Sequence, residues 1–191
     1  MDTTRPSLLL RLRRHSDADA WRTFDAIYRP MLRRFARARG FSEEDAEDVV
    51  QHCMVQVLDH ISDFRYDPAQ GRFKGWLRTL VNNRIRDLLR QRRDSPAAAS
   101  SLDALPDGGP SPEEAFEQIW MEEHLAHCLR EISSEVEERT FQAFWQVVME
   151  QKPVDEVSAA LGLRPNNIYT IKWRLTERIA ARMQELVDGL E

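Results

Sequence analysis

A strongly basic stretch between residues 72 and 93 constrains this 191-residue chain more than any other part of its sequence. It carries eight lysines and arginines against one acid, Asp87, so it concentrates positive charge. Its apolar residues recur at helical spacing and form one core-facing stripe, made of Trp76, Leu77, Leu80, Val81, Ile85, Leu88 and Leu89. The opposite side collects Arg78, Thr79, Asn82, Asn83, Arg86, Arg90 and Arg93.

The polar side of this stretch differs from an ordinary solvated surface, which mixes both signs of charge. Asparagine donates and accepts hydrogen bonds at base edges, and arginine pairs with phosphate or guanine. Two adjacent amides, Asn82 and Asn83, are also poor helix formers, which favours a use for them beyond solvation. The stretch is therefore predicted to be a helix that binds nucleic acid.

The overall charge of −5 conceals alternating blocks of opposite charge. Residues 40–71 hold eight acids and one base, and residues 94–160 hold fifteen acids and three bases. Acidic blocks beside a basic one predict a polyanionic partner together with at least one other partner. No apolar run is long enough to span a membrane, and no signal peptide opens the chain, so we expect a cytoplasmic protein.

Helical periodicity recurs along the chain and alternating apolar and polar runs are absent, which predicts an all-α fold. We expect helices over residues 5–14 and 17–39, with Pro30 kinking or dividing the second. Gly40 is expected to end that helix in a left-handed conformation, and Ser42 to cap the next one.

Residues 94–112 are predicted to form a flexible linker, because they hold four prolines, two adjacent glycines and few apolar side chains. The predicted organisation is therefore two small helical domains, residues 1–94 and 113–191, joined by residues 95–112. The second domain is expected to open with a helix over residues 113–131.

Further along the second domain, a capping box at Ser134 predicts the start of the next helix. Residues 153–175 then follow the pattern of a helix-turn-helix, with a turn at Gly162 and Pro165 in the first turn of the longer helix. In this motif the first residues of the second helix enter the major groove of DNA. Here those residues include Asn166, Asn167, Tyr169 and Thr170, followed by Lys172, Trp173 and Arg174.

Several sequence blocks resemble those of a known family. The blocks are EDAEDVVQ at residues 44–51, FKGWL at 73–77 with Asn83 and DLLR at 87–90, VSAALGL at 157–163, and IYTIKWRL at 168–175. In this order and spacing the chain resembles bacterial RNA polymerase sigma factors of the sigma-70 family, in the small extracytoplasmic-function (ECF) group. A helix-turn-helix block alone is only suggestive because such sequences are common, but the two blocks together are specific.

The resemblance implies that residues 1–94 form sigma region 2, which binds core polymerase and recognises and melts the −10 element. It implies that residues 113–191 form region 4, which reads the −35 element. Contacts with the clamp helices of the largest polymerase subunit would fall on Glu44, Asp45, Glu47, Asp48 and Gln51. Contacts with the −10 element would fall on Phe64, Tyr66, Arg72, Phe73, Lys74, Arg78, Thr79, Asn82, Asn83, Arg86 and Arg90. Contacts with the −35 element would fall on Arg164, Asn166, Asn167, Tyr169, Thr170, Lys172, Trp173 and Arg174.

The resemblance also implies further partners and leaves some roles open. The linker would run toward the RNA exit path, the polymerase flap would be a further contact, and many relatives bind an anti-sigma factor.

Phe64 and Phe73 fit loop anchors as well as base-stacking groups, and Trp76 lies on the apolar stripe and so fits the core. The acidic face of residues 44–51 lacks a basic counterpart, which favours a partner site. Trp173 stands where relatives often carry serine.

No grouping of residues predicts an enzyme, and no cofactor is expected. Cys53 and Cys128 lie in apolar helical contexts, which argues against a disulfide framework. His124, His127 and Cys128 share a helix face, but they lack a fourth ligand at suitable spacing, so core packing is favoured over a metal site.

Two other functions fit parts of the sequence. A stand-alone helix-turn-helix regulator would bind duplex DNA without polymerase, but it would leave the acidic helix and the first basic helix without a role. A helical scaffold would leave both basic faces unexplained.

Overall fold

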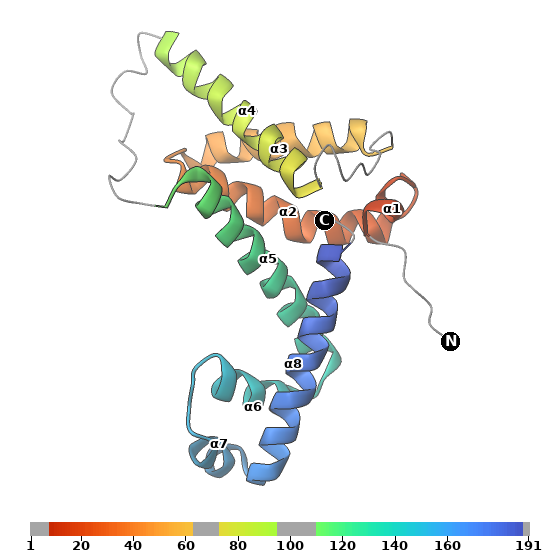
Figure 1. Cartoon of the computed structure of the whole chain (residues 1–191), viewed down its shortest axis with the longest axis vertical. Coiled ribbons are helices and arrows are strands. Elements are labelled where there is room, and N and C mark those ends of the chain that lie inside the picture. The colour runs from red at the N-terminus through yellow and green to blue at the C-terminus, as the bar shows by residue number, and fades with distance from the viewer. Residues whose placement is uncertain (1–7, 63–72, 95–109, 189–191) are drawn as a thin grey trace. The chain divides into compact units, whose positions relative to one another are not determined.

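The computed structural model describes residues 8–62, 73–94 and 110–188, and every regular element in these ranges is an α-helix (Figure 1). The helices are α1 (Leu8–Leu12), α2 (Ala18–Ala38), α3 (Glu43–His60), α4 (Phe73–Asp94), α5 (Pro112–Glu135), α6 (Glu138–Val148), α7 (Val154–Leu161) and α8 (Pro165–Asp188). The prediction of an all-α fold is confirmed. Within the described ranges, no helix has both the length and the apolar character needed to cross a membrane.

The helix ends of the first half follow local signals in the sequence. The Asp17 carboxylate caps α2 by accepting a hydrogen bond of 2.9 Å from the Ala20 amide. The chain leaves α2 through Gly40 at φ 80°, as expected from a left-handed glycine. Ser42 caps α3 by accepting from the Asp45 amide at 3.2 Å. Pro30 lies inside α2, and the helix continues through it to Ala38.

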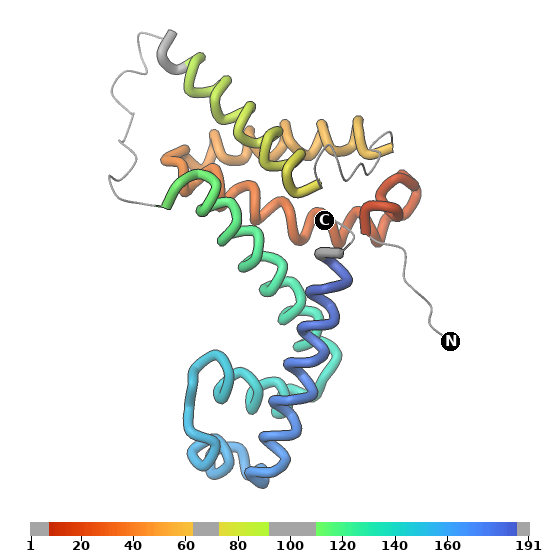
Figure 2. The backbone as a smooth tube through the Cα atoms, viewed as in Figure 1, coloured from red at the N-terminus to blue at the C-terminus, as the bar shows by residue number. Residues whose placement is uncertain are grey.

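Contacts between residues divide the chain into two compact units within α5, one reaching as far as Glu123 and the other comprising His124–Leu186. The tube in Figure 2 shows α5 continuing as one helix through this point. The boundary predicted from the sequence lies earlier, in residues 95–112, of which 95–109 fall outside the described ranges. The division into residues 1–94, 95–112 and 113–191 stays a prediction.

The first unit is built around α2, whose inner face is fully buried. α3 packs along α2, and α4 packs on α3. The first three turns of α5 also contribute to this core, because Phe116 lies edge-on to Phe35 at 5.3 Å and Trp120 lies 5.4 Å from Tyr28 between ring centroids. This packing explains why the start of α5 belongs to the first unit.

The second unit encloses its own apolar core between the end of α5 and α6, α7 and α8. The buried residues of this core are Cys128, Leu129, Ile132, Ala143, Phe144, Val157, Ile168, Ile171, Leu175 and Ile179. Those of α8 recur at spacings of three and four, so the helix keeps one side for the core and one for solvent.

The capping box predicted at Ser134 is wrong, because α5 continues to Glu135. The Ser134 hydroxyl donates to the Glu131 carbonyl within the helix instead of capping the next one. Two arginines of α8 stabilise the longer α5, since Arg178 and Arg182 each pair with Glu135 at 2.6 Å.

Candidate nucleic-acid interface

One face of α4 presents polar and basic side chains to solvent. With about 100° of rotation per residue, Thr79, Asn83, Arg86 and Arg90 fall on one line along the helix, and all four are exposed. We call this line the outer stripe. The opposite side of α4 buries Phe73, Leu77, Val81 and Ile85 against the rest of the first unit. All four residues of the outer stripe belong to the polar side of this helix that the sequence predicts.

The residues at the start of α4 lie in different surroundings from the outer stripe. The Lys74 ammonium bonds to the Glu117 carboxylate of α5, and an Arg78 nitrogen lies 3.7 Å from the other Glu117 oxygen. Asn82 is half-buried. Lys74 and Arg78 therefore differ from the outer stripe in having an acid of α5 beside them.

The aromatic residues predicted near this helix are only partly covered by the structure. Phe73 is fully buried in an aromatic cluster, with its ring 6.0 Å from Phe24 and 5.6 Å from Tyr28 between centroids. Because no part of this ring reaches the surface, we leave Phe73 out of the proposed binding surface. Trp76 is half-buried and packs 5.6 Å from Phe73. Phe64, Tyr66 and Arg72 lie outside the described residues.

One side of the first three turns of α8 forms a second exposed surface. Asn166, Thr170 and Trp173 lie on one line that points away from the core, and Trp173 is 67% exposed. The predicted residues Arg164, Asn167, Tyr169 and Arg174 flank this line and are also exposed. Lys172 is exposed too, but its position in the helical rotation sets it nearer the core-facing side.

An arginine that the sequence did not single out holds the turn before α8. The Arg139 guanidinium of α6 donates to the carbonyls of Leu161 and Gly162, at 2.8 Å from Nε and 2.9 Å from Nη2, respectively. Gly162 adopts φ 61°, and the Leu163 amide donates back to the Ser158 carbonyl. Arg139 therefore ties α6 to the α7–α8 turn and fixes where α8 begins.

Replacing Arg139 with alanine is expected to loosen this turn without unfolding the second unit. The hydrogen bonds at the end of α7 are exposed, so their loss is worth about 1–2 kcal/mol. Amide hydrogen exchange in peptides from α7 and the turn should accelerate by about tenfold. Arg139→Lys is the matched control, since it keeps the charge but lacks the fork of donors. Equal exchange rates in Arg139→Ala and the wild type would contradict this role.

The acidic surface of α3 has basic neighbours that the sequence pattern did not reveal. Arg29 of α2 donates to Glu47 at 2.8 Å, and Arg84 of α4 pairs with Asp48. The expectation that this face lacks a basic counterpart is therefore wrong. Glu44 and Gln51 remain exposed, and Asp45 is half-buried beside the Ser42 cap.

Comparisons with known proteins bear on these surfaces. The family model described as Sigma-70 region 2 matches residues 26–95, which include the larger part of α2 and all of α3 and α4. The chain is 35% identical over 78 residues to the ECF RNA polymerase sigma factor SigM of Mycobacterium tuberculosis, a match that covers 39% of the chain. It is 26% identical over 168 residues to the RNA polymerase sigma factor CarQ of Myxococcus xanthus, covering 88% of the chain and 91% of CarQ. The chain is thus similar to sigma-70 region 2 over residues 26–95 and to ECF and related sigma factors at 26–35% identity.

The sigma-70 region 2 match contains both the acidic surface of α3 and the outer stripe of α4. The helix-turn-helix of α7 and α8 lies beyond that match, and the CarQ alignment is long enough to reach into it. The chain spans 38% of the length of the SigM relatives that it matches, which come from two strains.

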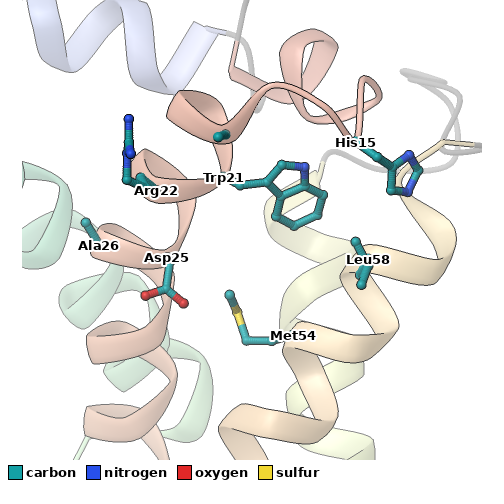
Figure 3. Close-up of a pocket in the computed structure, with 8 residues that line it drawn as sticks. His15, Trp21, Arg22, Asp25, Ala26, Met54 and Leu58 are labelled. Carbon is teal, nitrogen blue, oxygen red and sulfur yellow. The ribbon is translucent and has the colours of Figure 1, made fainter.

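The match to sigma-70 region 2 points to a family whose members are in general not enzymes. Figure 3 shows a pocket between α2 and α3 in which the Trp21 ring lies near Met54 and Leu58. The pocket is lined by His15, Ala18, Trp21, Arg22, Asp25, Ala26, Met54 and Leu58, which include no serine, threonine or cysteine nucleophile.

The two cysteines and the histidine cluster lie in the protein interior. Burial raises the pKa of the Cys53 thiol to about 12 and that of Cys128 to about 11, so both stay protonated near neutral pH. His124 and His127 are also buried. Among the described residues, no group of three or more potential ligands is arranged to hold a metal ion.

Proposed function

We propose that the chain is a sigma factor that binds core RNA polymerase, recognises the −10 and −35 elements of a promoter and melts the −10 region. The observation that carries this proposal is the outer stripe of α4, which combines an amide with two arginines inside the residues that match sigma-70 region 2. A protein with this role acts in the cytoplasm of a bacterium, where the promoters lie.

The chemistry of α4 suits capture of an opened strand. Separating DNA costs about 1.4 kcal/mol per base-pair step. A protein that does not hydrolyse ATP must offset this cost by binding the separated strand, through phosphate contacts and through stacking worth roughly 1–3 kcal/mol per base. Arg86 and Arg90 supply charge on the outer stripe, and Asn83 supplies a donor and an acceptor for a base edge.

The chemistry of α8 suits a different task, reading duplex DNA. Asn166 and Asn167 are exposed in the first turn of α8, and Tyr169 is 57% exposed. Asparagine pairs with adenine in the major groove, and an apolar side chain such as Trp173 contacts the methyl group of thymine. We propose that residues 113–191 act as region 4, with residues 95–112 as the linker from region 2 in residues 1–94.

A stand-alone helix-turn-helix regulator is the alternative, and it makes no use of α3 or of the outer stripe. Run-off transcription with core polymerase, with and without this chain, on a set of candidate promoters separates the two. If the chain is a sigma factor, transcripts that start at a single site appear when the chain is present and are absent without it. Duplex DNA binding by the chain, with neither core binding nor any such transcript, would favour the regulator.

Docking on the clamp helices of the largest polymerase subunit is proposed for the exposed acids of α3, with the flap and an anti-sigma factor as further partners. Glu44→Arg is expected to weaken binding to core polymerase about tenfold, because it reverses a charge on this exposed face. Biolayer interferometry with immobilised core polymerase measures the change. Asp59→Arg is the matched control, since it reverses an exposed acid at the other end of α3.

Asp48 is a poorer probe of docking than Glu44. Reversing its charge would set two arginines against each other, because Asp48 pairs with Arg84 in the first unit. A loss of binding in Asp48→Arg would therefore mix docking with stability. Wild-type affinity in Glu44→Arg, with the control also unchanged, would reject the docking surface.

A further inference from the structure

The first three turns of α5, residues 112–123, place an acidic face against the start of the basic helix α4. This segment contains five glutamates and no lysine or arginine, and we call it the acidic cover. One Glu117 oxygen bonds to the Lys74 ammonium, and the other lies 3.7 Å from Nη1 of Arg78. The Lys74 ammonium also lies 5.5 Å from the centroid of the Trp120 ring. Both cations are thus occupied from within the chain.

The acidic cover is anchored to the first unit by apolar packing as well as by charge. Trp120 is 1% exposed and packs on Tyr28, and Phe116 is fully buried against Phe35. Aromatic side chains of this size contribute strongly to a core because of the area they bury. The anchor keeps Glu117 in place beside Lys74.

A second set of ion pairs fixes the far end of the acidic cover to α2. Arg34 donates to Glu122 at 2.6 Å and to Glu123 at 2.7 Å. The hydrogen bonds to Glu123 and Glu122 both raise the pKa of the Arg34 guanidinium, and the bond to Glu123 has the larger effect. The acidic cover therefore satisfies basic groups on both α2 and α4.

Lys74 and Arg78 lie in the first two turns of α4, within the helix along which a bound strand is proposed to run. A cation that faces a carboxylate has to give up that partner before it contacts a phosphate. By contrast, no hydrogen bond or ion pair among the described residues joins the outer stripe to the acidic cover. Nucleic acid can therefore reach one part of α4 directly and the other part only in competition with Glu117.

We propose that the acidic cover and single-stranded nucleic acid compete for Lys74 and Arg78, so that the free chain binds DNA more weakly than its basic helix allows. This inference rests on the proposed function, because it requires α4 to bind nucleic acid. The acidic cover then acts as an internal substitute for the phosphates, and displacing it adds two cations to the binding surface.

The test compares Glu117→Gln with Glu113→Gln in the full chain. Both variants remove one negative charge from the acidic cover, but Glu113 is exposed at the helix start and only Glu117 faces the two cations. Fluorescence anisotropy with a fluorescein-labelled, mixed-sequence DNA single strand of about 20 nucleotides, long enough to exceed the usual site sizes, gives the dissociation constant. A further variant adds Lys74→Ala and Arg78→Ala to Glu117→Gln.

Glu117→Gln is expected to bind the strand about two- to fivefold more tightly than Glu113→Gln, the range for loss of exposed ion pairs. Because two more cations meet phosphates, the slope of log affinity against log salt should steepen by about 1.4. Adding Lys74→Ala and Arg78→Ala should remove both effects. Equal affinities and slopes in the two glutamine variants would overturn the competition but leave binding by α4 intact. Absence of strand binding in all variants would refute the nucleic-acid role of α4 itself.

Discussion

Replacing Phe73 with alanine is expected to lower the free energy of unfolding of the first unit by about 3–5 kcal/mol, the usual cost of emptying a buried phenylalanine site. The ring is fully buried, with Phe24 and Tyr28 edge-on to it at 6.0 and 5.6 Å between centroids. Deleting it leaves a cavity where α2 and α4 meet and removes these aromatic contacts. Trp76 also loses its neighbour at 5.6 Å.

Urea unfolding followed by circular dichroism at 222 nm measures this change. Two compact units need not unfold in one step, so the transition of the first unit has to be resolved from that of the second. Thr79→Ala is the matched control in the same helix, since Thr79 is exposed and should change stability by less than about 0.5 kcal/mol. A loss of less than about 1 kcal/mol in the free energy of unfolding would be well below the range for a buried ring. If Phe73→Ala showed so small a loss and also weakened DNA binding, the ring would act at the surface and not in the core.

The position of Phe73 shows what a helical pattern in the sequence can and cannot predict. The sequence predicts that α4 buries one side, and Leu77, Val81 and Ile85 are indeed buried. Phe73 precedes them by the same step of four residues, so the spacing alone could have placed it in the core. Its position after the aromatic residues Phe64 and Tyr66 instead suggested a second role in base stacking, which the sequence could not separate from the first.

Features set by nearby residues were predictable in this chain. Ser42 caps α3, Gly40 leaves α2 at positive φ, and Gly162 forms the turn before α8. Each depends on the conformation or hydrogen bonding of a few consecutive residues, so the local sequence contains the signal. The prediction at Ser134 failed because the end of α5 is stabilised by distant arginines such as Arg182, which no local pattern records.

Features set by the packing of distant helices were not predictable. Periodicity shows that Phe116 and Trp120 face a core, but it does not say which core, and the linker before them suggested the second domain. The pairs of Arg29 with Glu47 and of Arg84 with Asp48 join different helices, across 18 and 36 residues of the sequence. An exposed charge and a paired charge have the same sequence signature, so α3 could be recognised as acidic but not as partly neutralised.

The outer stripe of α4 leads to the prediction with the largest expected effect on activity. The double variant Asn83→Ala with Arg86→Ala removes one amide and one cation from exposed positions one turn apart. Contacts of these kinds are worth about 1–3 kcal/mol each, so run-off transcription with core polymerase should fall by at least about tenfold. Because both side chains are exposed and neither supports the core, the thermal stability of the first unit should change little.

A template that is already open in the −10 region distinguishes two reasons for that loss. If the outer stripe only helps to separate the strands, a mismatched bubble should restore transcription by the double variant. If it holds the separated strand, as proposed here, the bubble template should leave most of the defect in place, since the lost contacts are with the single strand itself. Arg22→Ala with Gln91→Ala is the matched control, because it removes an exposed arginine and an exposed amide that lie off the stripe. Wild-type activity of Asn83→Ala with Arg86→Ala on duplex promoters would exclude the outer stripe from initiation, and the search for the −10 contacts would then move to residues 64–72, which precede α4 in the sequence.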